Sequence, residues 1–303
     1  MKLSFRTLAA LLSLSGWSAF ACTGEVLPTP ATDAGEDVQV ADSATDSSKP
    51  DASGDSATEA ATDATTDATP PYDVKTTAGL VLWLDAAQGV TGTSAVSAWA
   101  DQSGSNNSAA MATANYQPAL VAASIGGKPA IHFTGGTHLA VADAVSLQWG
   151  TADFHVSIVL KHNTLSSTYG MVFSKQEAAN PFPGPGIFAN YPLPSQGTAI
   201  GGQVNYNTYI STATTGLNDN VGRQFSLTRT GGVISVRVNG TQTTGASSAI
   251  NVDAVGRVLS LGANATGGQA LSGDIAEVIA IKGAISVGTM ASLEGYLKAK
   301  YAL

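Results

Sequence analysis

The chain has 303 residues but only one cysteine, Cys22. A lone cysteine excludes a disulfide within the chain, and it excludes a zinc site built from cysteine thiolates. A folded region of about 200 residues does not need such links, because it buries enough apolar surface on its own.

Charged residues are also scarce, at 12% of the chain, and basic residues are the rarer sign, with 14 Lys and Arg against 22 Asp and Glu. The acidic excess is confined to residues 23–75, which hold twelve acidic residues and two lysines. Residues 76–303 carry ten residues of each sign and therefore no net charge. A neutral region with scattered basic residues has no electrostatic footprint for nucleic acid, so we expect no nucleic-acid partner.

The start of the chain has an apolar stretch, Leu8–Leu14, that is too short to span a hydrocarbon core about 30 Å thick. Lys2 and Arg6 precede this stretch, and the small-x-small sequence Ala19–Ala21 follows it. This order is typical of an export signal. We therefore predict a signal peptide over residues 1–21 and an exported protein.

Cys22 follows this segment directly and precedes a polar tether, which resembles the acylation site of bacterial lipoproteins. The resemblance implies a lipid on Cys22, and Thr23 after it implies sorting to the outer membrane. The predicted location is the cell envelope or cell surface, with the lipid as the attachment to the membrane. Without the lipid, the protein is expected to be secreted.

Residues 22–75 form a low-complexity linker of Ala, Thr, Asp and Ser, for example SATEAATDATTDATPP. A segment with few large apolar residues and many like charges does not offset the entropy of ordering, so we expect it to be disordered. As a flexible coil, about 50 residues have a root-mean-square reach of about 40 Å, which charge repulsion extends.

Residues 76–303 are predicted to form one domain of short strands separated by Gly, Asn and Pro. In residues 155–162, Val156, Ile158 and Leu160 alternate with the residues of the opposite face. Residues 223–245 contain two turn signals, GG at 231–232 and NG at 239–240, each between alternating runs. This pattern predicts a three-stranded meander.

The end of the chain is predicted to form a helix, because Ser286 can cap it and Met290, Leu293, Leu297 and Tyr301 recur at helical spacing. Many short strands and one terminal helix predict an all-β fold, a two-sheet antiparallel jelly-roll β-sandwich with a short C-terminal helix. The sequence shows no βαβ alternation, which argues against a parallel doubly wound sheet.

Several blocks of this region resemble bacterial LamG-like domains, in the same order. They are GLVLWLDA (79–86), VSAWADQSG (96–104), GKPAIHFTG (127–135), RTGGVISVRVNG (229–240) and GDIAEV (273–278). LamG-like domains belong to the concanavalin A-like lectin/glucanase superfamily, so the resemblance implies a jelly-roll sandwich over residues 76–303. This fold hosts binding modules, hydrolases, lyases and adhesion domains, and it does not choose among them.

Asp274 and Glu277 test whether the domain is a glycosidase, because both lie in the predicted closing strand. Glycosidases place two carboxyl groups beside one sugar bond, about 5–5.5 Å or about 6.5–9.5 Å apart. Residues three apart in a regular strand face opposite ways, so we predict no catalytic pair here and no enzyme. Glu277 is expected to be buried with a partner, and Asp274 is expected to hold a turn. Catalysis by carboxylates from separate strands is the alternative.

No pattern in residues 76–303 identifies a cofactor or a metal site. The four histidines show neither HExxH nor close spacing, and the chain has no nucleophile elbow and no phosphate loop. We therefore predict no cofactor. Calcium held by scattered Asp and carbonyl oxygens stays open, but no calcium ligand is identified.

Residues 180–209 combine Pro, Gly and aromatic residues and predict a long ordered loop. Aromatic faces pack on the C–H surfaces of sugars, and amides bond to sugar hydroxyls. The candidate ligand-binding residues are Phe182, Tyr191, Asn205, Tyr206, Asn207 and Tyr209. Alternatively, the rings only attach the loop to the sandwich.

Taken together, these patterns predict a non-catalytic, lectin-like domain at the cell surface whose partner is a glycan or another surface ligand. One alternative is a hydrolase or lyase that degrades polysaccharides on the same fold. The other alternative is an adhesion module that binds a protein.

Overall fold

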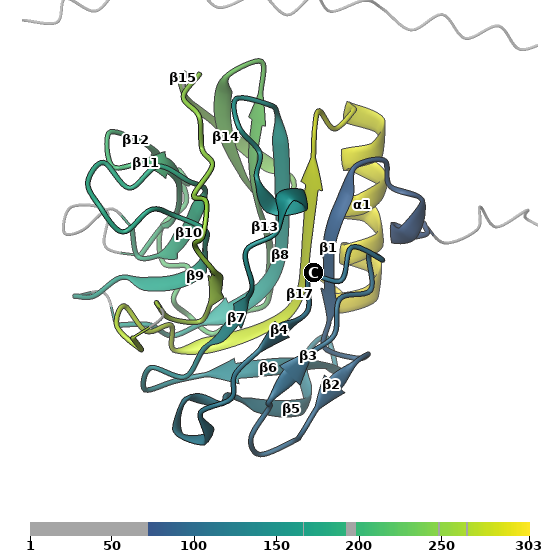
Figure 1. The fold of residues 1–303 in the computed structure, drawn as a ribbon. Coiled ribbons are helices and arrows are strands. Elements are labelled where there is room, and N and C mark those ends of the chain that lie inside the picture. Colours follow the sequence, from purple (N-terminus) through teal and green to yellow (C-terminus); the bar gives the residue numbers. More distant parts are fainter. Residues whose placement is uncertain (1–71, 166, 192–197, 248, 265) are drawn as a thin grey trace, which may run out of the picture. The chain divides into compact units, whose positions relative to one another are not determined.

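The computed structural model describes residues 72–165, 167–191, 198–247, 249–264 and 266–303. The predicted signal peptide, the predicted acylation site Cys22 and nearly all of the predicted linker lie outside these ranges. Within them, the chain forms two antiparallel β-sheets and a C-terminal helix (Figure 1), which confirms the predicted β-sandwich.

One sheet has eight strands in the order β15-β14-β13-β8-β17-β6-β5, and β1 pairs with the second half of β17. The predicted meander is β13, β14 and β15, and the closing strand β17 lies in the middle of the sheet. The strands are β1 (Leu80–Asp85), β5 (Ala119–Ile125), β6 (Lys128–Phe133), β8 (Phe154–His162), β13 (Arg223–Thr230), β14 (Val233–Val238), β15 (Thr241–Ser247) and β17 (Gly273–Lys282).

The other sheet has nine strands in the order β12-β11-β10-β9-β16-β7-β4-β3-β2. They are β2 (Val90–Thr91), β3 (Ala98–Trp99), β4 (Ala109–Ala110), β7 (Leu139–Val141), β9 (Gly170–Ser174), β10 (Gly186–Ala189), β11 (Ile200–Asn205), β12 (Thr208–Ser211) and β16 (Leu259–Leu261). Three short 3-10 helices lie in connections, η1 (Val74–Thr76), η2 (Ala114–Tyr116) and η3 (Val145–Leu147).

The main hydrophobic core lies between the sheets and takes alternate residues from their strands. On β8, Val156, Ile158 and Leu160 face this core, as their alternation predicts. On β16, Leu259 and Leu261 face it as well, so the residue between them lies on the outer face. This alternation decides which side chains each sheet presents on its outside.

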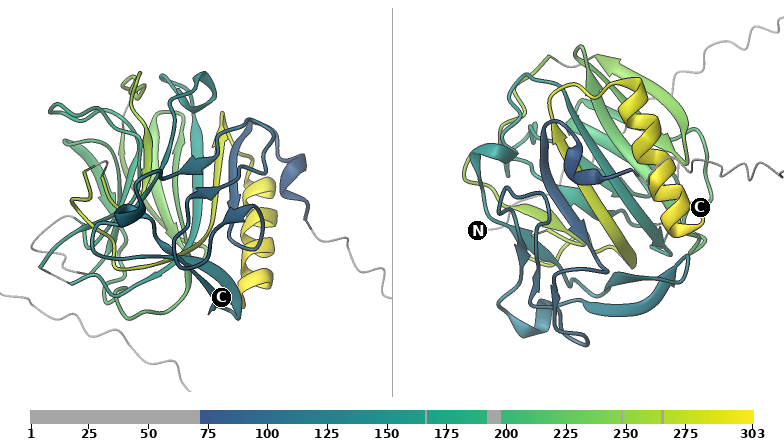
Figure 2. Two further views of the ribbon diagram at one scale, coloured as in Figure 1. Left: turned by 60° about the horizontal axis from the view of Figure 1, so that its bottom comes forward. Right: turned by 90° about the vertical axis from the view of Figure 1, so that its right-hand side faces the viewer.

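Helix α1 (Val287–Tyr301) lies against the outer face of the eight-stranded sheet (Figure 2). The side chain of Ser286 caps its first turn, and Leu293, Leu297 and Tyr301 are buried, as predicted, whereas Met290 of the same spacing is only partly buried. The three buried residues form a second apolar cluster with the outer face of the sheet. Among the described residues, no helix has the length and apolar character needed to cross a membrane.

The prediction of one long loop over residues 180–209 is wrong. Strands β10, β11 and the start of β12 run through this stretch and pair with one another in order. At Gly201 a Cβ would meet the ring of Tyr191, and at Gly202 it would meet Leu227 of the facing sheet. Glycine usually indicates a loop, but here it makes room for neighbouring side chains within a strand.

A bulge in β17 sets the direction of its two carboxylates. The pairing of β17 with β8 shifts between Ile275 and Glu277, and Ala276 packs with the cluster under α1. Glu277 then faces α1, and Asp274 faces the same side of the sheet, where it bonds to His132. The prediction of opposite faces is wrong, because one extra residue re-aims the chain.

Glu277 is only 1% exposed and is fully partnered, which confirms the prediction for this residue. Its carboxylate accepts hydrogen bonds from Trp83 Nε1 at 2.7 Å, Tyr296 at 3.0 Å and Tyr301 at 2.8 Å, and it pairs with Lys300 at 2.8 Å. Helix α1 therefore covers this carboxylate and keeps it away from solvent.

Asp274 is 4% exposed and does not hold a turn, so that prediction is wrong. It bonds to His132 Nδ1 of β6 at 2.5 Å and to Ser124 of β5, and it lies 3.3 Å from Lys161 Nζ of β8. Its role is to join three neighbouring strands, because β17 runs between β6 and β8.

Candidate functional site

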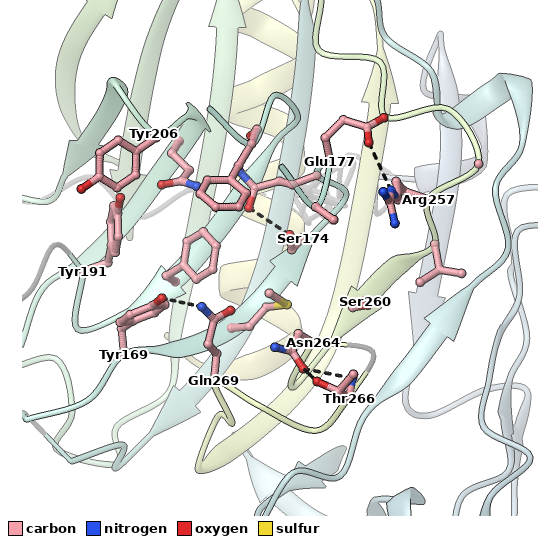
Figure 3. Close-up of a pocket in the computed structure, with 18 residues that line it drawn as sticks. Tyr169, Ser174, Glu177, Tyr191, Tyr206, Arg257, Ser260, Asn264, Thr266 and Gln269 are labelled. Atoms are coloured by element: carbon pink, nitrogen blue, oxygen red, sulfur yellow. Dashed lines mark hydrogen bonds and ion pairs between the residues drawn. The ribbon is translucent and has the colours of Figure 1, made fainter. Parts of the chain in front are cut away.

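An open groove with a volume of about 660 Å³ lies over the outer face of the nine-stranded sheet. Outer-facing residues of β9, β10, β11 and β16 line it, together with the segments that connect these strands (Figure 3). Figure 3 shows tyrosines on one side of the groove and the charged side chains of Glu177 and Arg257 on the other. The groove therefore has an aromatic side and a polar side.

The aromatic side is a set of rings in mutual contact. Tyr169, Phe188 and Tyr191 have ring centroids 5.3–5.8 Å apart, and Tyr209 approaches Tyr191 at 5.7 Å. Tyr206 stands at the rim and is 56% exposed. Burial, with a smaller contribution from the neighbouring tyrosines, raises the pKa of Tyr191 to about 12, so its ring stays neutral. This side offers uncharged aromatic surface.

The floor of the groove consists of amide and hydroxyl groups. Ser174 and Ser260 lie opposite each other on β9 and β16, and Ser174 donates to Oε1 of Gln176 at 3.1 Å. Gln203 of β11 is 5% exposed, yet its Oε1 accepts no hydrogen bond from any described residue. An unpartnered buried acceptor costs free energy, about 1–3 kcal/mol, and the side chain that carries it belongs to a residue that lines the groove.

The polar rim carries one ion pair. Arg257 Nε lies 3.1 Å from Glu177 Oε2, and the two side chains are 47% and 31% exposed. Glu177 follows β9, whereas Arg257 precedes β16, its neighbour in the sheet. The pairing of these strands therefore brings together two charges that are 80 positions apart in the chain.

A buried lysine fixes this rim. Lys175 is 1% exposed, and its Nζ donates to Asp143 Oδ1 at 2.7 Å and to the carbonyl oxygens of Ala254 at 2.9 Å and Arg257 at 3.0 Å. The hydrogen bond from Lys175 holds the pKa of Asp143 below its usual value against the opposing effect of burial. Asp143 Oδ2 also accepts from the backbone of Gly256 at 2.6 Å. The segment that carries Arg257 is thus bonded at three points.

The structure places three of the six candidate residues in the groove, Phe182, Tyr191 and Tyr206. Tyr209 is not among the residues that line the groove, but its ring contacts that of Tyr191. Of the other two, Asn205 ends β11 and Asn207 lies in the turn to β12, where Asn205 Oδ1 accepts from the backbone of Asn207 at 2.9 Å. Ligand binding by all six residues stays a prediction.

Sequence reasoning missed the remaining groove residues, among them Tyr169, Phe188, Gln203, Glu177 and Arg257. Gln203 and Phe188 lie in strands, where alternation with core residues was the available signal. Glu177 and Arg257 had no such signal, because they meet only through strand pairing.

Metal ligands do not gather in the described part of the chain. Within it, no group of three or more His, Cys, Asp or Glu side chains is placed to hold a metal ion. Glu177 is the one carboxylate among the described residues that line the groove. A pair of carboxylates facing one sugar bond is therefore not formed by these lining residues.

No protein-family model matches the sequence, and a search of curated proteins found no match either. Solved structures share the fold. An arabinofuranosidase complexed with arabinofuranosyl-α-1,2-xylobiose matches with a TM-score of 0.53 and 13% identity over 68% of this chain and 51% of that chain. A Trypanosoma rangeli sialidase in complex with sialic acid matches with a TM-score of 0.53 and 14% identity over 74% and 33%.

A third similar structure is domain 4 of an extracellular arabinanase from Geobacillus stearothermophilus, in complex with arabinotriose. It has a TM-score of 0.50 and 15% identity, and the match covers 72% of this chain and 98% of that domain. The chain spans about half or less of the length of the arabinofuranosidase and the sialidase. At these identities, the likeness shows a shared β-sandwich fold.

These neighbours contradict the prediction that the chain is not an enzyme. Two of them are glycosidases, so the fold occurs in enzymes that cleave sugar bonds. The prediction used the spacing of two carboxylates on one strand and assumed a regular strand. Strand β17 contains a bulge, so that assumption does not hold. The spacing argument also did not exclude a catalytic pair formed by carboxylates on separate strands.

Proposed function

We propose that the groove over the nine-stranded sheet binds a carbohydrate chain. The observation that carries this proposal is the aromatic side formed by Tyr169, Tyr191 and Tyr206, which lies beside a floor of amide and hydroxyl side chains that includes Gln203. Sugars have both apolar C–H faces and hydroxyl donors, so they satisfy both surfaces at once.

The energetics favour a hydroxylated ligand over a purely apolar one. A sugar hydroxyl that donates to Gln203 removes the cost of a buried acceptor without a partner. Further hydroxyls meet Ser174 and Ser260, and exposed ring surface at Tyr206 packs against the sugar. A purely apolar ligand leaves the floor amides and hydroxyls unpaired, which costs free energy.

In the cell, we propose that this domain is a LamG-like module that is exported and tethered by a lipid on Cys22, with the acidic linker as a spacer. The sequence patterns at residues 1–22 and 22–75 support this part of the proposal. Metabolic labelling with a radioactive fatty acid tests it: the native chain is expected to carry label, and Cys22→Ser is expected to carry none. Equal labelling of the two chains contradicts the tether.

The direct test of sugar binding is isothermal titration of the purified Cys22→Ser chain with arabinotriose, xylotriose and cellotriose. We expect saturable binding of at least one trimer, and we expect Gln203→Leu to weaken it. Absence of binding by all three, or binding that Gln203→Leu does not change, contradicts the proposed site.

The same samples test for hydrolysis. Reducing ends are measured after long incubation of each trimer with the chain and with Glu177→Gln, since Glu177 is the lining carboxylate among the described residues. Release of reducing ends that depends on Glu177 assigns hydrolysis to this groove. Binding without release assigns sugar recognition to it under the conditions tested.

A further inference from the structure

The charge of the groove rests on two side chains. Among the described lining residues, Glu177 is the one acid and Arg257 is the one base, and the rest are aromatic, aliphatic, amide, hydroxyl or glycine residues. The charges of Glu177 and Arg257 cancel, because the two side chains form an ion pair. The groove as a whole therefore presents no net charge to a ligand.

Hydrogen bonds fix the backbones that carry these two charges. Lys175 lies two residues before Glu177, and its Nζ binds the carbonyl oxygen of Arg257. The backbone of Glu177 is held as well, because its N–H donates to the carbonyl oxygen of Pro183 at 2.9 Å. Glu177 and Arg257 thus meet at a fixed place on the rim.

Arg257 has more donors than Glu177 occupies. Its Nε bonds to Glu177, and its side chain is 47% exposed, with no other hydrogen bond from the guanidinium to a described residue. A guanidinium without a carboxylate partner binds an external carboxylate or sulfate in a bidentate manner. The carboxylate of Glu177 stands where such an anionic group on a sugar would bind.

We propose that Glu177 is a specificity-determining residue that makes the groove select uncharged glycans and reject those with carboxylate or sulfate groups. This inference rests on the proposed function of the groove. An anionic sugar at this rim finds the guanidinium of Arg257 already paired with Glu177, so its charge loses hydration without gaining a free cation. A neutral sugar meets a donor and an acceptor side by side.

The test compares a neutral trimer, arabinotriose, with an anionic one, trigalacturonate, by titration at low salt. In the wild type, we expect trigalacturonate to bind at least about tenfold more weakly than the neutral trimer. In Glu177→Gln, we expect the ratio of anionic to neutral affinity to rise about tenfold, because Arg257 is freed. Glu177→Gln/Arg257→Gln is expected to return this ratio to the wild-type value.

The matched control is Glu294→Gln, which removes the same charge from a different ion pair. In that pair, Glu294 of α1 bonds to Arg237 of β14. The ratio of anionic to neutral affinity in Glu294→Gln is expected to equal that of the wild type. An unchanged ratio in Glu177→Gln, with the fold intact by circular dichroism, overturns the inference. A wild type that binds both trimers equally well overturns the charge selection alone. A wild type that binds neither trigalacturonate nor any of the three neutral trimers contradicts the proposed function and the selection with it.

Discussion

The carboxylate of Glu277 lies 2.8 Å from the ammonium group of Lys300, and this ion pair joins the central strand β17 to helix α1. Lys300 also lies 2.8 Å from Asp85 of β1. Both carboxylates are buried, at 1% and 2% exposure. One lysine on the helix thus compensates two buried negative charges on neighbouring strands, and the attachment of α1 depends on it.

Removal of that lysine is expected to destabilise the fold strongly. Lys300→Met leaves Glu277 and Asp85 buried without a cation, and breaking one side of a buried ion pair costs about 3–5 kcal/mol. Urea unfolding followed by tryptophan fluorescence measures the loss. Lys298→Met is the control, because it changes a neighbouring lysine on α1 whose side chain makes no hydrogen bond among the described residues. Equal losses in the free energy of unfolding of the two variants contradict the role of Lys300 in compensating the two buried carboxylates.

Alkaline pH is expected to weaken the fold through the same network. Burial works to lower the pKa of Lys300, but the charge of Glu277 and the hydrogen bonds to Asp85, Glu277 and Tyr296 outweigh it and raise that pKa above its usual value of 10.5. Burial also raises the pKa of Tyr301. Groups with a raised pKa in the folded state stabilise it fully below the unfolded pKa, and this stabilisation is lost as pH rises beyond it.

We therefore expect the free energy of unfolding to fall as pH rises above about 10, the usual range of lysine and tyrosine side chains. Lys300→Met is expected to show a shallower fall, because one titrating group is gone. Urea midpoints measured between about pH 8 and pH 11.5 check both statements, because this range covers the ordinary pKa values of lysine and tyrosine side chains. A flat profile in the wild type contradicts the role of the network.

Acidic pH is expected to act through two buried histidines. Burial is the main cause that lowers the pKa of His155 and of His162 from 6.5 to about 4. The unfolded chain therefore takes up protons at a higher pH than the folded chain, and stability is lost as pH falls from 6.5 toward 4. Each histidine contributes a slope of up to about 1.4 kcal/mol per pH unit.

The variant that checks this effect is His162→Leu, because neither ring nitrogen of His162 has a partner among the described residues. Its loss of stability between pH 6.5 and pH 4.5 is expected to be smaller than that of the wild type, because its unfolding takes up about one proton fewer in this range. Equal slopes, from urea unfolding at each pH, argue against a neutral buried His162.

Gln203 is expected to lower the stability of the fold and to raise its affinity for a sugar. In Gln203→Leu, the unpartnered acceptor is gone, so the free energy of unfolding is expected to rise by about 1 kcal/mol while sugar affinity falls about tenfold. Gln224→Leu is the matched control, because Gln224 Oε1 on the other sheet also lacks a partner among the described residues. That control is expected to keep its sugar affinity. An equal fall in sugar affinity in both variants contradicts direct binding of the sugar by Gln203.

Tyr206 is expected to contribute to affinity without contributing to stability, because its side chain is 56% exposed. Tyr206→Ala is expected to weaken sugar binding about five- to tenfold, the effect of losing a stacked ring. Its melting temperature is expected to match that of the wild type. Tyr116→Ala, at a 38% exposed tyrosine outside the groove, is the control for loss of surface ring area. Unchanged binding in Tyr206→Ala removes this residue from the site.

The fold was predictable where local patterns carry it. Alternation placed Val156, Ile158 and Leu160 of β8 in the core, and helical spacing with Ser286 as cap located α1. The candidate site was predictable only in part. Aromatic residues pointed to Phe182, Tyr191 and Tyr206 of the groove, whereas the glycine-rich strands around them were mistaken for a loop.

The sequence by itself determined the β-sandwich, the neutral charge of residues 76–303 and the capped terminal helix, because alternation, composition and capping are local properties of the chain. Tertiary structure alone decided the bulge that turns Glu277 toward Lys300, and the meeting of Glu177 with Arg257. Both depend on which strands lie side by side. Strand neighbours far apart in the chain are chosen by packing of the whole core, so no local pattern records them.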